Sequence, residues 1–309
     1  MNPVSASLPA IKRSQSSNSR ESFFAGRTQI IGNSSSIGAI LVNAGRLSEE
    51  NVARILEAQA QQQNHFGDAA ISLGLLTDDD VRFALSRQFN NLYLPAGDNS
   101  LSHHLIAAYK PFSPVVEHLR SLRSQLMLRW FEPDADRNVL AIVSPGAREG
   151  RSFMAANLAI VFSQLGKSTL LIDANLRAPR QQEFFKVNTG GGLSSYLSGR
   201  AGLESIIRIP PLPGLSVLPA GAVPPNPQEL IGRPIFADLL QLIGCEFDVV
   251  IVDTPSASEY AEAQVIATEA SAALIVLRKN HTSLSRTVEL ARRFQQTGAA
   301  VVGSVLNDF

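Results

Sequence analysis

Cysteine, unbalanced charge and long apolar runs are all scarce in this sequence, and each shortage excludes a class of protein. A single cysteine, Cys245, rules out an intramolecular disulfide framework and any metal cluster built from several cysteines. The 27 basic and 27 acidic residues cancel, so the charge balance gives no reason to expect nucleic acid as a partner. No run approaches the roughly 18 apolar residues that span a bilayer. We therefore expect a cytoplasmic protein.

The composition changes along the chain and predicts four regions. Residues 1–35 are rich in serine and lack the apolar stretch of a secretory signal, so a disordered tail is expected. Residues 36–90 carry a repeat typical of a small helical domain. Residues 91–113 carry the prolines and glycine typical of a linker with at most one short helix. Residues 114–309 begin with a helical pattern and then alternate strands with helices.

From residue 139 onward, short apolar runs of β-forming residues alternate with helical patterns and Gly/Pro-rich loops. The runs fall at 139–143, 168–172, 215–218, 248–252, 272–277 and 300–305. Strands that alternate with helices pair in parallel and are covered by helices on both faces. The predicted fold class is therefore α/β, a doubly wound and mostly parallel sheet that binds ligands at the carboxyl ends of its strands.

The first of these strands leads into the loop Pro145–Phe153, which is followed by a helical pattern. A loop of this kind binds phosphate, because backbone N–H groups and the positive end of the helix dipole converge on an anion. In the pattern G-x-x-x-x-G-K-[ST], Gly150 and Ser152 match. Arg151 stands at the lysine position and Pro145 at the first glycine position. Taken alone, this loop is a weak match.

Two later strands each end in a carboxylate, Asp173 and Asp253. Together with the Ser152 hydroxyl they could hold Mg²⁺ against nucleotide phosphates, because Mg²⁺ prefers carboxylate, hydroxyl, phosphate and water oxygens. One carboxylate would remain to orient or deprotonate an attacking hydroxyl. A single aspartate at a strand end is more often a cap or turn residue. The ordered set of three strand ends favours nucleotide binding.

The region from Pro114 to Phe309 resembles the bacterial tyrosine kinases of exopolysaccharide and capsule export, which share a P-loop fold with the MinD/ParA ATPases. The motifs that carry the resemblance are Pro145–Phe153 (Walker A), Leu171–Arg177 (Walker A′), Val249–Pro255 (Walker B), Val217–Gly221 with Pro224–Leu230, and Gly303–Asn307. The resemblance implies ATP and Mg²⁺ as cofactors. It also implies a separate membrane co-polymerase as partner, which would hold the protein at the inner face of the membrane.

Residue roles follow from the same resemblance. The implied nucleotide-binding residues are Gly146, Ala147, Arg148, Glu149, Gly150, Arg151, Ser152, Phe153 and Asn307. Arg151 would replace the catalytic lysine, and Ser152, Asp253 and Asp173 would surround the metal. Asp173 would also act as the catalytic base toward a tyrosine hydroxyl. Arg177 would contact phosphate or a neighbouring subunit.

Glu117, Arg120 and Arg123 recur at spacings of three within the helical pattern of residues 115–131. They match the E-x-x-R-x-x-R helix through which these kinases form rings, so the resemblance implies a homo-oligomer. From the residues alone, a solvated charged face is the preferred interpretation of this stripe.

The repeat in residues 36–90 pairs Ser36–Gly45 with His65–Gly74, and each copy precedes an amphipathic helix. It resembles the N-terminal domain of type II secretion ATPases, some of which bind cyclic di-GMP. The matching positions are Gly38, Leu41, Val42, Gly45, Gly67, Ile71 and Gly74. Ser36 and His65 replace the arginines whose planar fork suits guanine and phosphate. The resemblance implies the fold, and binding of cyclic di-GMP stays open.

With this N-terminal domain added, the chain resembles the EpsG type of chain-length-determinant tyrosine kinase. A tyrosine kinase is the first hypothesis, and a kinase-inactive nucleotide switch or scaffold is the second. Arg151 and Asn175, which replaces an acidic Walker A′ residue, favour the second, as does the lack of a C-terminal tyrosine cluster. The Asp173/Asp253 pair favours the first. A MinD/ParA-type positioning ATPase is disfavoured because Gly146 stands where those proteins carry a lysine.

Overall fold

We analysed a computed structural model of the chain, which describes residues 36–62, 64–88, 93–95, 97–131, 137–188 and 190–308. The predicted disordered tail, residues 1–35, lies outside the described residues. The chain divides between Thr77 and Asp78 into two compact units.

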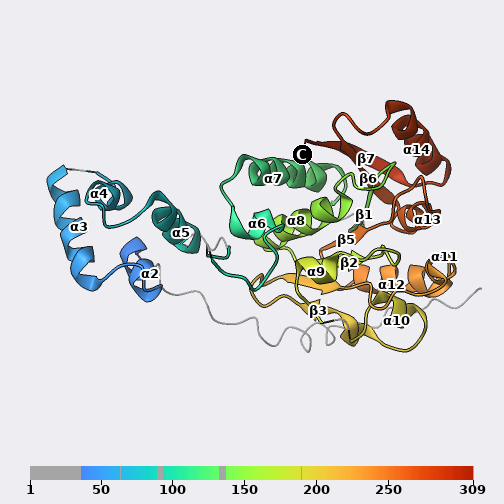
Figure 1. Cartoon of the computed structure of the whole chain (residues 1–309), viewed down its shortest axis with the longest axis horizontal. Helices are drawn as coiled ribbons and strands as arrows, with labels where there is room; N and C mark the ends of the chain where they lie inside the picture. The colour runs from blue at the N-terminus through green and yellow to red at the C-terminus, as the bar shows by residue number, and fades with distance from the viewer. Residues whose placement is uncertain are drawn as a thin grey trace, which may run out of the picture. The chain divides into compact units, whose positions relative to one another are not determined.

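The first unit contains the helices α2 (Ile37–Asn43), α3 (Glu49–Gln62) and α4 (Phe66–Ser72) (Figure 1). The two copies of the repeat close in the same way. Gly45 and Gly74, with φ of 68° and 66°, follow the ends of α2 and α4 in the left-handed conformation that glycine adopts most readily.

Packing accounts for several glycine and apolar positions of the repeat without a ligand. A Cβ at Gly38 would lie 3.2 Å from a methyl group of Val52 and 3.4 Å from the ring of Phe66, so a larger side chain would push the helices apart. Leu41 is fully buried, whereas Ile71 is 39% exposed. Gly38 and Leu41 thus meet the needs of helix packing, and cyclic di-GMP binding stays a prediction.

The second unit begins with α5 (Asp78–Gln88). The described part of residues 91–113 contains one helix, α6 (Ile106–Tyr109), in keeping with the sequence. The backbone of Ala107 is bound at both ends by helix α8 (Arg151–Gln164): its N–H donates to Asn157 Oδ1 at 2.9 Å, and its C=O accepts from Gln164 Nε2 at 2.9 Å. This segment is therefore packed into the unit.

Seven strands form one sheet in the order β3-β4-β2-β5-β1-β6-β7. The strands are β1 (Val139–Val143), β2 (Thr169–Asp173), β3 (Ile207–Arg208), β4 (Leu215–Leu218), β5 (Val249–Asp253), β6 (Ala272–Arg278) and β7 (Ala300–Asn307). All neighbours pair in parallel except β3, which is antiparallel to β4. The prediction of a doubly wound, mostly parallel sheet is confirmed. Every predicted strand run is present, and the two-residue β3 is the addition.

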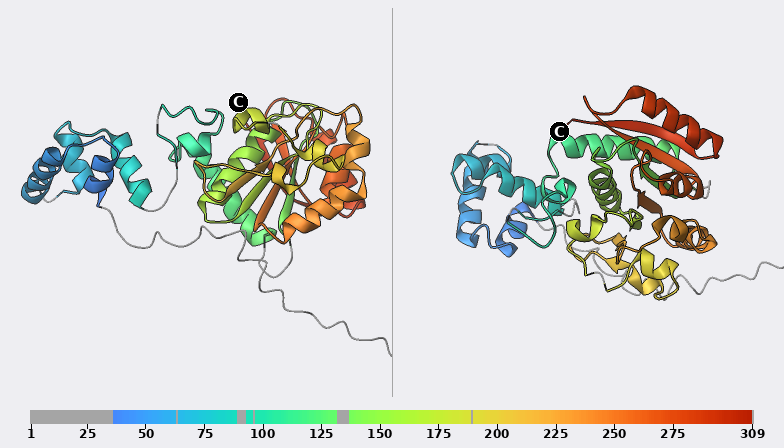
Figure 2. Two further views of the ribbon diagram at one scale, coloured as in Figure 1. Left: turned by 90° about the horizontal axis from the view of Figure 1, so that it is seen from below. Right: turned by 45° about the vertical axis from the view of Figure 1, so that its right-hand side comes forward.

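Helices cover both faces of the sheet (Figures 1 and 2). The remaining helices are α7 (Pro114–Arg129), α9 (Gln181–Phe184), α10 (Leu193–Leu197), α11 (Pro227–Ile231), α12 (Pro234–Gly244), α13 (Glu262–Glu269), α14 (Leu284–Gln296) and the 3₁₀ turn Leu203–Ser205. Alternate strand residues face two separate apolar cores: Leu140 and Ile142 pack with α7 and α8, and Val139 and Val143 pack with α11 to α14. This alternation explains why the central strands β1 and β5 are apolar along almost their whole length.

The strand order brings the predicted site together. Strand β5 lies between β1 and β2, and Asp173 pairs in register with Asp253. The loop after β1 therefore starts beside both carboxylates, as expected for a parallel sheet whose strands all end at one edge.

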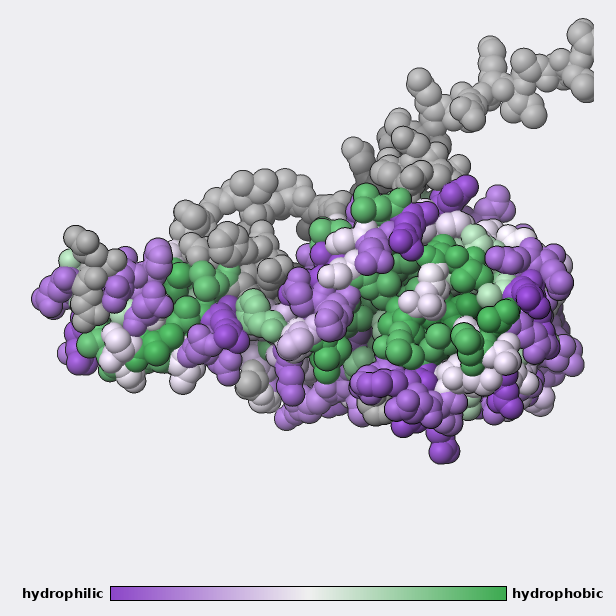
Figure 3. All heavy atoms as spheres, turned by 90° about the horizontal axis from the view of Figure 1, so that it is seen from above, coloured by the Kyte–Doolittle hydropathy of each residue, from purple (hydrophilic) through white to green (hydrophobic). Residues whose placement is uncertain are grey.

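Some large apolar side chains lie on the surface. Apolar side chains gather on one face of the protein (Figure 3), and Leu306 on β7 is 60% exposed. Leu128 on α7 and Leu284 on α14 are 79% and 77% exposed. Within the described ranges, no helix has the length and apolarity required to cross a membrane.

The buried amide of Asn157 should contribute strongly to stability. Its Nδ2 donates to the backbone oxygens of His104 at 3.1 Å and Phe153 at 2.9 Å, in addition to the bond from Ala107 N. Asn157→Ala would leave buried backbone groups unpaired, so we expect a loss of roughly 2–4 kcal/mol of unfolding free energy in urea titrations. Gln296→Ala, at an exposed helix position, is the control and should change stability by less than about 0.5 kcal/mol. A small effect at Asn157 would contradict the packed position of residues 104–107.

Candidate active site

The β1–α8 loop has the geometry of an anion-binding turn. Helix α8 begins at Arg151, and its N-cap Gly150 has φ 93°, a left-handed conformation that favours glycine. Arg148 also has a positive φ, 56°. The loop thus turns sharply onto the positive end of a 14-residue helix, where backbone N–H groups attract phosphate.

Arg151 lies beneath this loop. Its Nε donates to the backbone oxygen of Thr254 at 3.0 Å, and its guanidinium also donates to Gly146 O at 2.6 Å and to the hydroxyl of Ser144. Burial lowers the pKa of Arg151, and the charge of Asp253 acts in the opposite direction. Oxygens of the loop and of the segment after β5 therefore use part of the guanidinium's donor capacity, and contact with a phosphate stays a prediction.

Asp173 and Asp253 are both fully buried at the ends of β2 and β5. Asp173 Oδ1 accepts from Asn175 N at 3.2 Å, and its Oδ2 accepts from the N–H groups of Arg180 and Gln181, each at 2.9 Å. Burial and the neighbouring Asp253 raise the pKa of Asp173 to about 8, although the three backbone donors favour its charged form. The predicted base is thus also the anchor of the turn after β2.

The surroundings of Asp253 fit a divalent cation. Its Oδ1 is buried and has no hydrogen-bond partner among the described residues. Burial raises the pKa of the Asp253 carboxyl group, and the nearby Ser152 hydroxyl acts in the opposite direction. A free carboxylate oxygen beside a hydroxyl is a suitable pair of ligands for Mg²⁺, which takes its other ligands from phosphate and water. The described residues contain no cluster of three or more His, Cys, Asp or Glu that could hold a metal alone.

Gln181 was missed by the sequence reasoning. It is fully buried, and its Nε2 donates to Asp253 Oδ2 at 2.8 Å and to Ser152 O at 3.1 Å, while its backbone N–H binds Asp173. One residue therefore links both carboxylates and the first turn of α8. It carries no charge and follows Asp173 by eight residues through an irregular turn, so no sequence pattern marked it.

A hollow of about 630 Å³ adjoins the loop. It is lined by residues 145–149, by Ser258 and Glu259, and by residues 281–283 and Arg286. The predicted residues Gly146 to Glu149 thus line the hollow, and Gly150 to Phe153 form the start of α8. Asn307 Nδ2 donates to Glu149 O at 2.9 Å, and contact of Asn307 with adenine stays a prediction.

The predicted oligomerisation residues do not share one environment. Glu117 and Arg120 form an ion pair of 3.0 Å within α7. Arg123 instead donates to Val161 O on α8 at 2.7 Å, and burial lowers its pKa, with a smaller contribution from Arg120. The expectation of one charged face is therefore corrected for Arg123: its guanidinium binds its own chain, because the helical spacing carries it toward α8.

Arg177 also binds within its own chain. Its guanidinium forms an ion pair of 2.7 Å with the buried Glu262 and lies 4.1 Å from the ring centroid of Tyr260. Contact with phosphate or another subunit, as the resemblance implied, stays a prediction.

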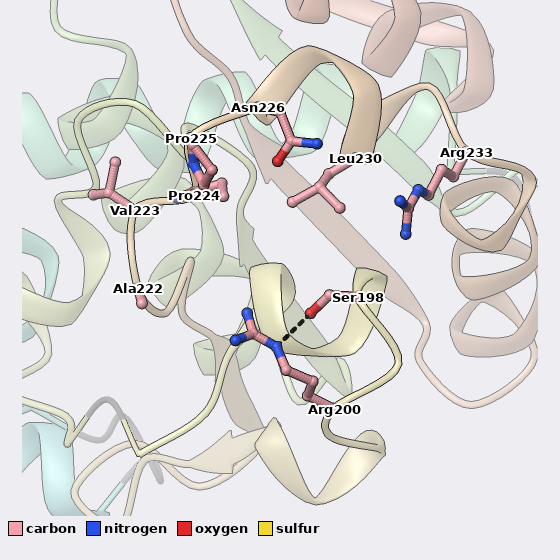
Figure 4. A pocket seen from close by; sticks show the side chains of 9 residues that line it. All are labelled: Ser198, Arg200, Ala222, Val223, Pro224, Pro225, Asn226, Leu230 and Arg233. Carbon is pink, nitrogen blue, oxygen red and sulfur yellow. Dashed lines mark hydrogen bonds between the residues drawn. The ribbon is translucent and has the colours of Figure 1, made fainter.

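A second hollow of about 410 Å³ opens beside the segment after β4 (Figure 4). Arg200 and Arg233 reach it from different segments, and Arg200 Nε donates to Ser198 Oγ at 2.9 Å. Its lining residues include neither the phosphate loop nor the two aspartates, so it is separate from the site above.

The strand–loop–helix of β1 and α8, the paired carboxylates and the strand order define a P-loop nucleotide-binding domain of the MinD/ParA type. The cell division ATPase MinD of Pyrococcus furiosus shares this fold with a TM-score of 0.50 and 24% identity, over 55% of this chain and 72% of that one. No family model matches the chain.

Tyrosine kinases share more of the sequence. The kinase domain of the Escherichia coli tyrosine kinase ETK is 31% identical, with a TM-score of 0.63, over 66% of this chain and 79% of that domain. A Klebsiella pneumoniae protein named as a tyrosine-protein kinase of the cps region is 34% identical over 210 residues, 68% of this chain and 29% of that protein. The chain belongs to the bacterial tyrosine-protein kinase family. It spans less than a third of the length of that Klebsiella relative.

The two buried carboxylates predict a pH dependence of stability. The pKa of Asp173 in the folded protein, about 8, exceeds the ordinary aspartate value of 3.8, so the folded state retains a proton between these two pH values. The contribution of protonated Asp173 to the stability of the fold is complete below pH 3.8 and is lost as the pH rises through 8. Asp253→Asn removes the neighbouring charge and should make the ligand-free protein more stable at pH 8, by on the order of 1 kcal/mol.

Chemical denaturation at several pH values would test this effect, with Asp238→Asn, an exposed change on α12, as the control. The difference between Asp253→Asn and the parent protein should grow from pH 5 to pH 8. A difference that is constant with pH would show that the two carboxylates do not interact.

Proposed function

We propose that the chain is an ATP- and Mg²⁺-dependent protein tyrosine kinase that regulates the polymerisation and export of an exopolysaccharide together with a membrane co-polymerase. The observation that carries the proposal is the meeting of Ser152, Asp173 and Asp253 at one sheet edge beside the phosphate loop. Membership of the tyrosine kinase family supports the reaction. The name of the Klebsiella relative and the sequence motifs support the polysaccharide setting.

In the proposed phosphoryl transfer, each of these residues has a separate role. Loop N–H groups at the start of α8 would bind the phosphates, and Ser152 and Asp253 would hold Mg²⁺, which supplies positive charge against phosphate oxygens when it is bound. Asp173 in its ionised form accepts the proton of a tyrosine hydroxyl as that oxygen bonds to the γ-phosphorus and ADP leaves. Gln181 fixes Asp253 Oδ2, so that Oδ1 stays free for the metal.

A kinase-inactive nucleotide switch is the second candidate, and specific contacts favour it. Both oxygens of Asp173 already accept backbone N–H groups. Asn175, which replaces an acidic residue, uses its side chain within the turn: Nδ2 donates to Ala178 O at 2.9 Å and Oδ1 accepts from Ala178 N at 3.2 Å. In this role, ATP binding would control assembly of the polysaccharide machinery without phosphoryl transfer.

The N-terminal unit and the assembly state complete the proposal. We assign residues 36–90, which extend past the first unit to include α5, a type II secretion ATPase-like fold on the basis of the repeat, with cyclic di-GMP as the ligand to test. Leu128, Leu284 and Leu306 are large apolar side chains that are each more than half exposed, and we propose that they contact other protein chains. Those chains would be further copies in a ring and the cytoplasmic part of the co-polymerase.

Asp173→Ala tests the kinase mechanism. Purified protein would be incubated with Mg·[γ-³²P]ATP, with and without the cytoplasmic part of a co-polymerase, and acid-stable phosphotyrosine would be measured. We expect the parent protein to transfer phosphate to tyrosine. The rate of transfer by the variant should be lower by about a hundredfold or more, since general base catalysis contributes roughly that factor. ATP affinity should remain within about threefold, because the loop N–H groups are untouched.

Asp238→Asn is the matched control for this experiment. ATP binding without transfer by the parent protein would favour the nucleotide switch. Transfer at the parent rate by Asp173→Ala would mean that another group takes the proton.

The pair Glu117 and Arg120 provides a test of ring formation. The double exchange Glu117→Arg, Arg120→Glu keeps the ion pair within α7 while it reverses the charges offered to a neighbouring copy. We expect the exchange to leave the melting temperature within about 2 °C and to reduce oligomer mass in analytical ultracentrifugation, because a like-charge contact across an interface is unfavourable. Unchanged oligomers would show that the charged face of α7 lies outside the interface.

A further inference from the structure

Glu149 occupies an unexpected position inside the phosphate loop. Its side chain is 2% exposed although it is a carboxylate in a loop beside a hollow. Its Oε2 accepts from the backbone N–H of Gly146 at 2.9 Å, and its Oε1 accepts from the hydroxyl of Thr282 at 2.6 Å. Both oxygens are therefore satisfied by groups at the mouth of the nucleotide site.

The donor at Gly146 belongs to the loop that should bind phosphate. A carboxylate on a P-loop N–H group offers the same chemistry as a phosphate oxygen: an anionic acceptor held by a backbone donor near a helix N-terminus. A phosphate brought to this N–H group and the Glu149 carboxylate would compete for it. They would also repel each other, because both are negative.

The surrounding residues keep the carboxylate in place. A Cβ at Gly146 would lie 3.0 Å from Glu149 Oε1, so the absence of a side chain there makes room for it. Asn307 Nδ2 holds the backbone oxygen of Glu149 at 2.9 Å, and Thr282 itself accepts from Arg278 N at 2.8 Å. Residues at the ends of β6 and β7 thus fix Glu149 over the loop.

We propose that Glu149 is an internal anionic plug of the phosphate loop, which the phosphates of the nucleotide must displace from Gly146 and Thr282. The plug lowers the affinity for nucleotide and stabilises the ligand-free loop. It restricts the site to ligands with enough negative charge and enough donors of their own to displace a bound carboxylate. The inference rests on the proposed nucleotide binding and adds a residue that controls its strength.

Glu149→Ala separates a plug from a structural support, because the two roles predict opposite changes in affinity. With the plug removed, Gly146 N–H is free and a negative charge is gone, so we expect Mg·ATP to bind at least about tenfold more tightly in isothermal titration calorimetry. The melting temperature without ligand should fall, since two internal hydrogen bonds are lost. The increase in melting temperature on adding Mg·ATP should become larger.

Two further variants keep the test decisive if Glu149→Ala folds poorly. Glu149→Gln retains the size and an acceptor for Gly146 N–H but removes the charge, so its gain in affinity should be smaller than that of Glu149→Ala. Thr282→Val removes one of the two anchors and should also raise affinity, but it should add little in the Glu149→Ala background. Glu246→Ala, at an exposed position after α12, is the control and should leave affinity unchanged.

The outcomes distinguish this inference from the proposed function. Equal or weaker Mg·ATP binding by Glu149→Ala, in a protein that still binds ATP, would overturn the plug and leave the proposed function intact. Failure of both the parent protein and the variant to bind ATP would overturn the proposed function and the inference with it.

Discussion

The site depends on two carboxylates held side by side without access to water. Asp173 and Asp253 pair in register at the ends of β2 and β5, and both are fully buried. Two such charges repel, and burial removes the water that would solvate them. The protein offsets this cost unevenly: Asp173 receives three backbone N–H groups, whereas Asp253 keeps one oxygen without a partner among the described residues. The pair therefore divides into an anchored carboxylate and one that is open to a cation.

Two neighbouring polar residues interact with Asp253 and leave its other oxygen open. Gln181 Nε2 binds the closed oxygen of Asp253, and Arg151 contributes positive charge from beneath the loop. A cation at the open oxygen would relieve the repulsion that the fold maintains in its absence. Binding of Mg²⁺ with a nucleotide would then stabilise the fold as well as the ligand, because a ligand that binds only the folded state shifts the unfolding equilibrium.

The sequence was sufficient to predict the sheet and the residues at its strand ends. Apolar runs followed by Asp173, Asp253 and the Gly150 turn are local patterns, and a parallel sheet necessarily brings their carboxyl ends to one edge. The contacts of Gln181, Asn157 and Glu149 were not predictable, because each joins residues from separate elements through an uncharged or solitary side chain. The contact of Arg123 with Val161 O was not predictable for a related reason. Helical spacing indicates which residues share a face, but it does not show which neighbouring element lies against that face.

The contacts of Arg151, which stands where the phosphate-loop pattern has lysine, were likewise not predictable from the sequence. From the sequence, Arg151 is a bulkier cation at a phosphate site, which suggested lost activity. In the fold, the guanidinium's planar arrangement of donors serves three acceptors at once: Thr254 O, Gly146 O and the Ser144 hydroxyl. A lysine ammonium at the end of a flexible chain lacks the planar fork that spans such separated acceptors. Arginine at this position therefore ties the loop to Thr254, which directly follows Asp253 at the end of β5, and so joins the two parts of the site that we propose to bind phosphate and metal.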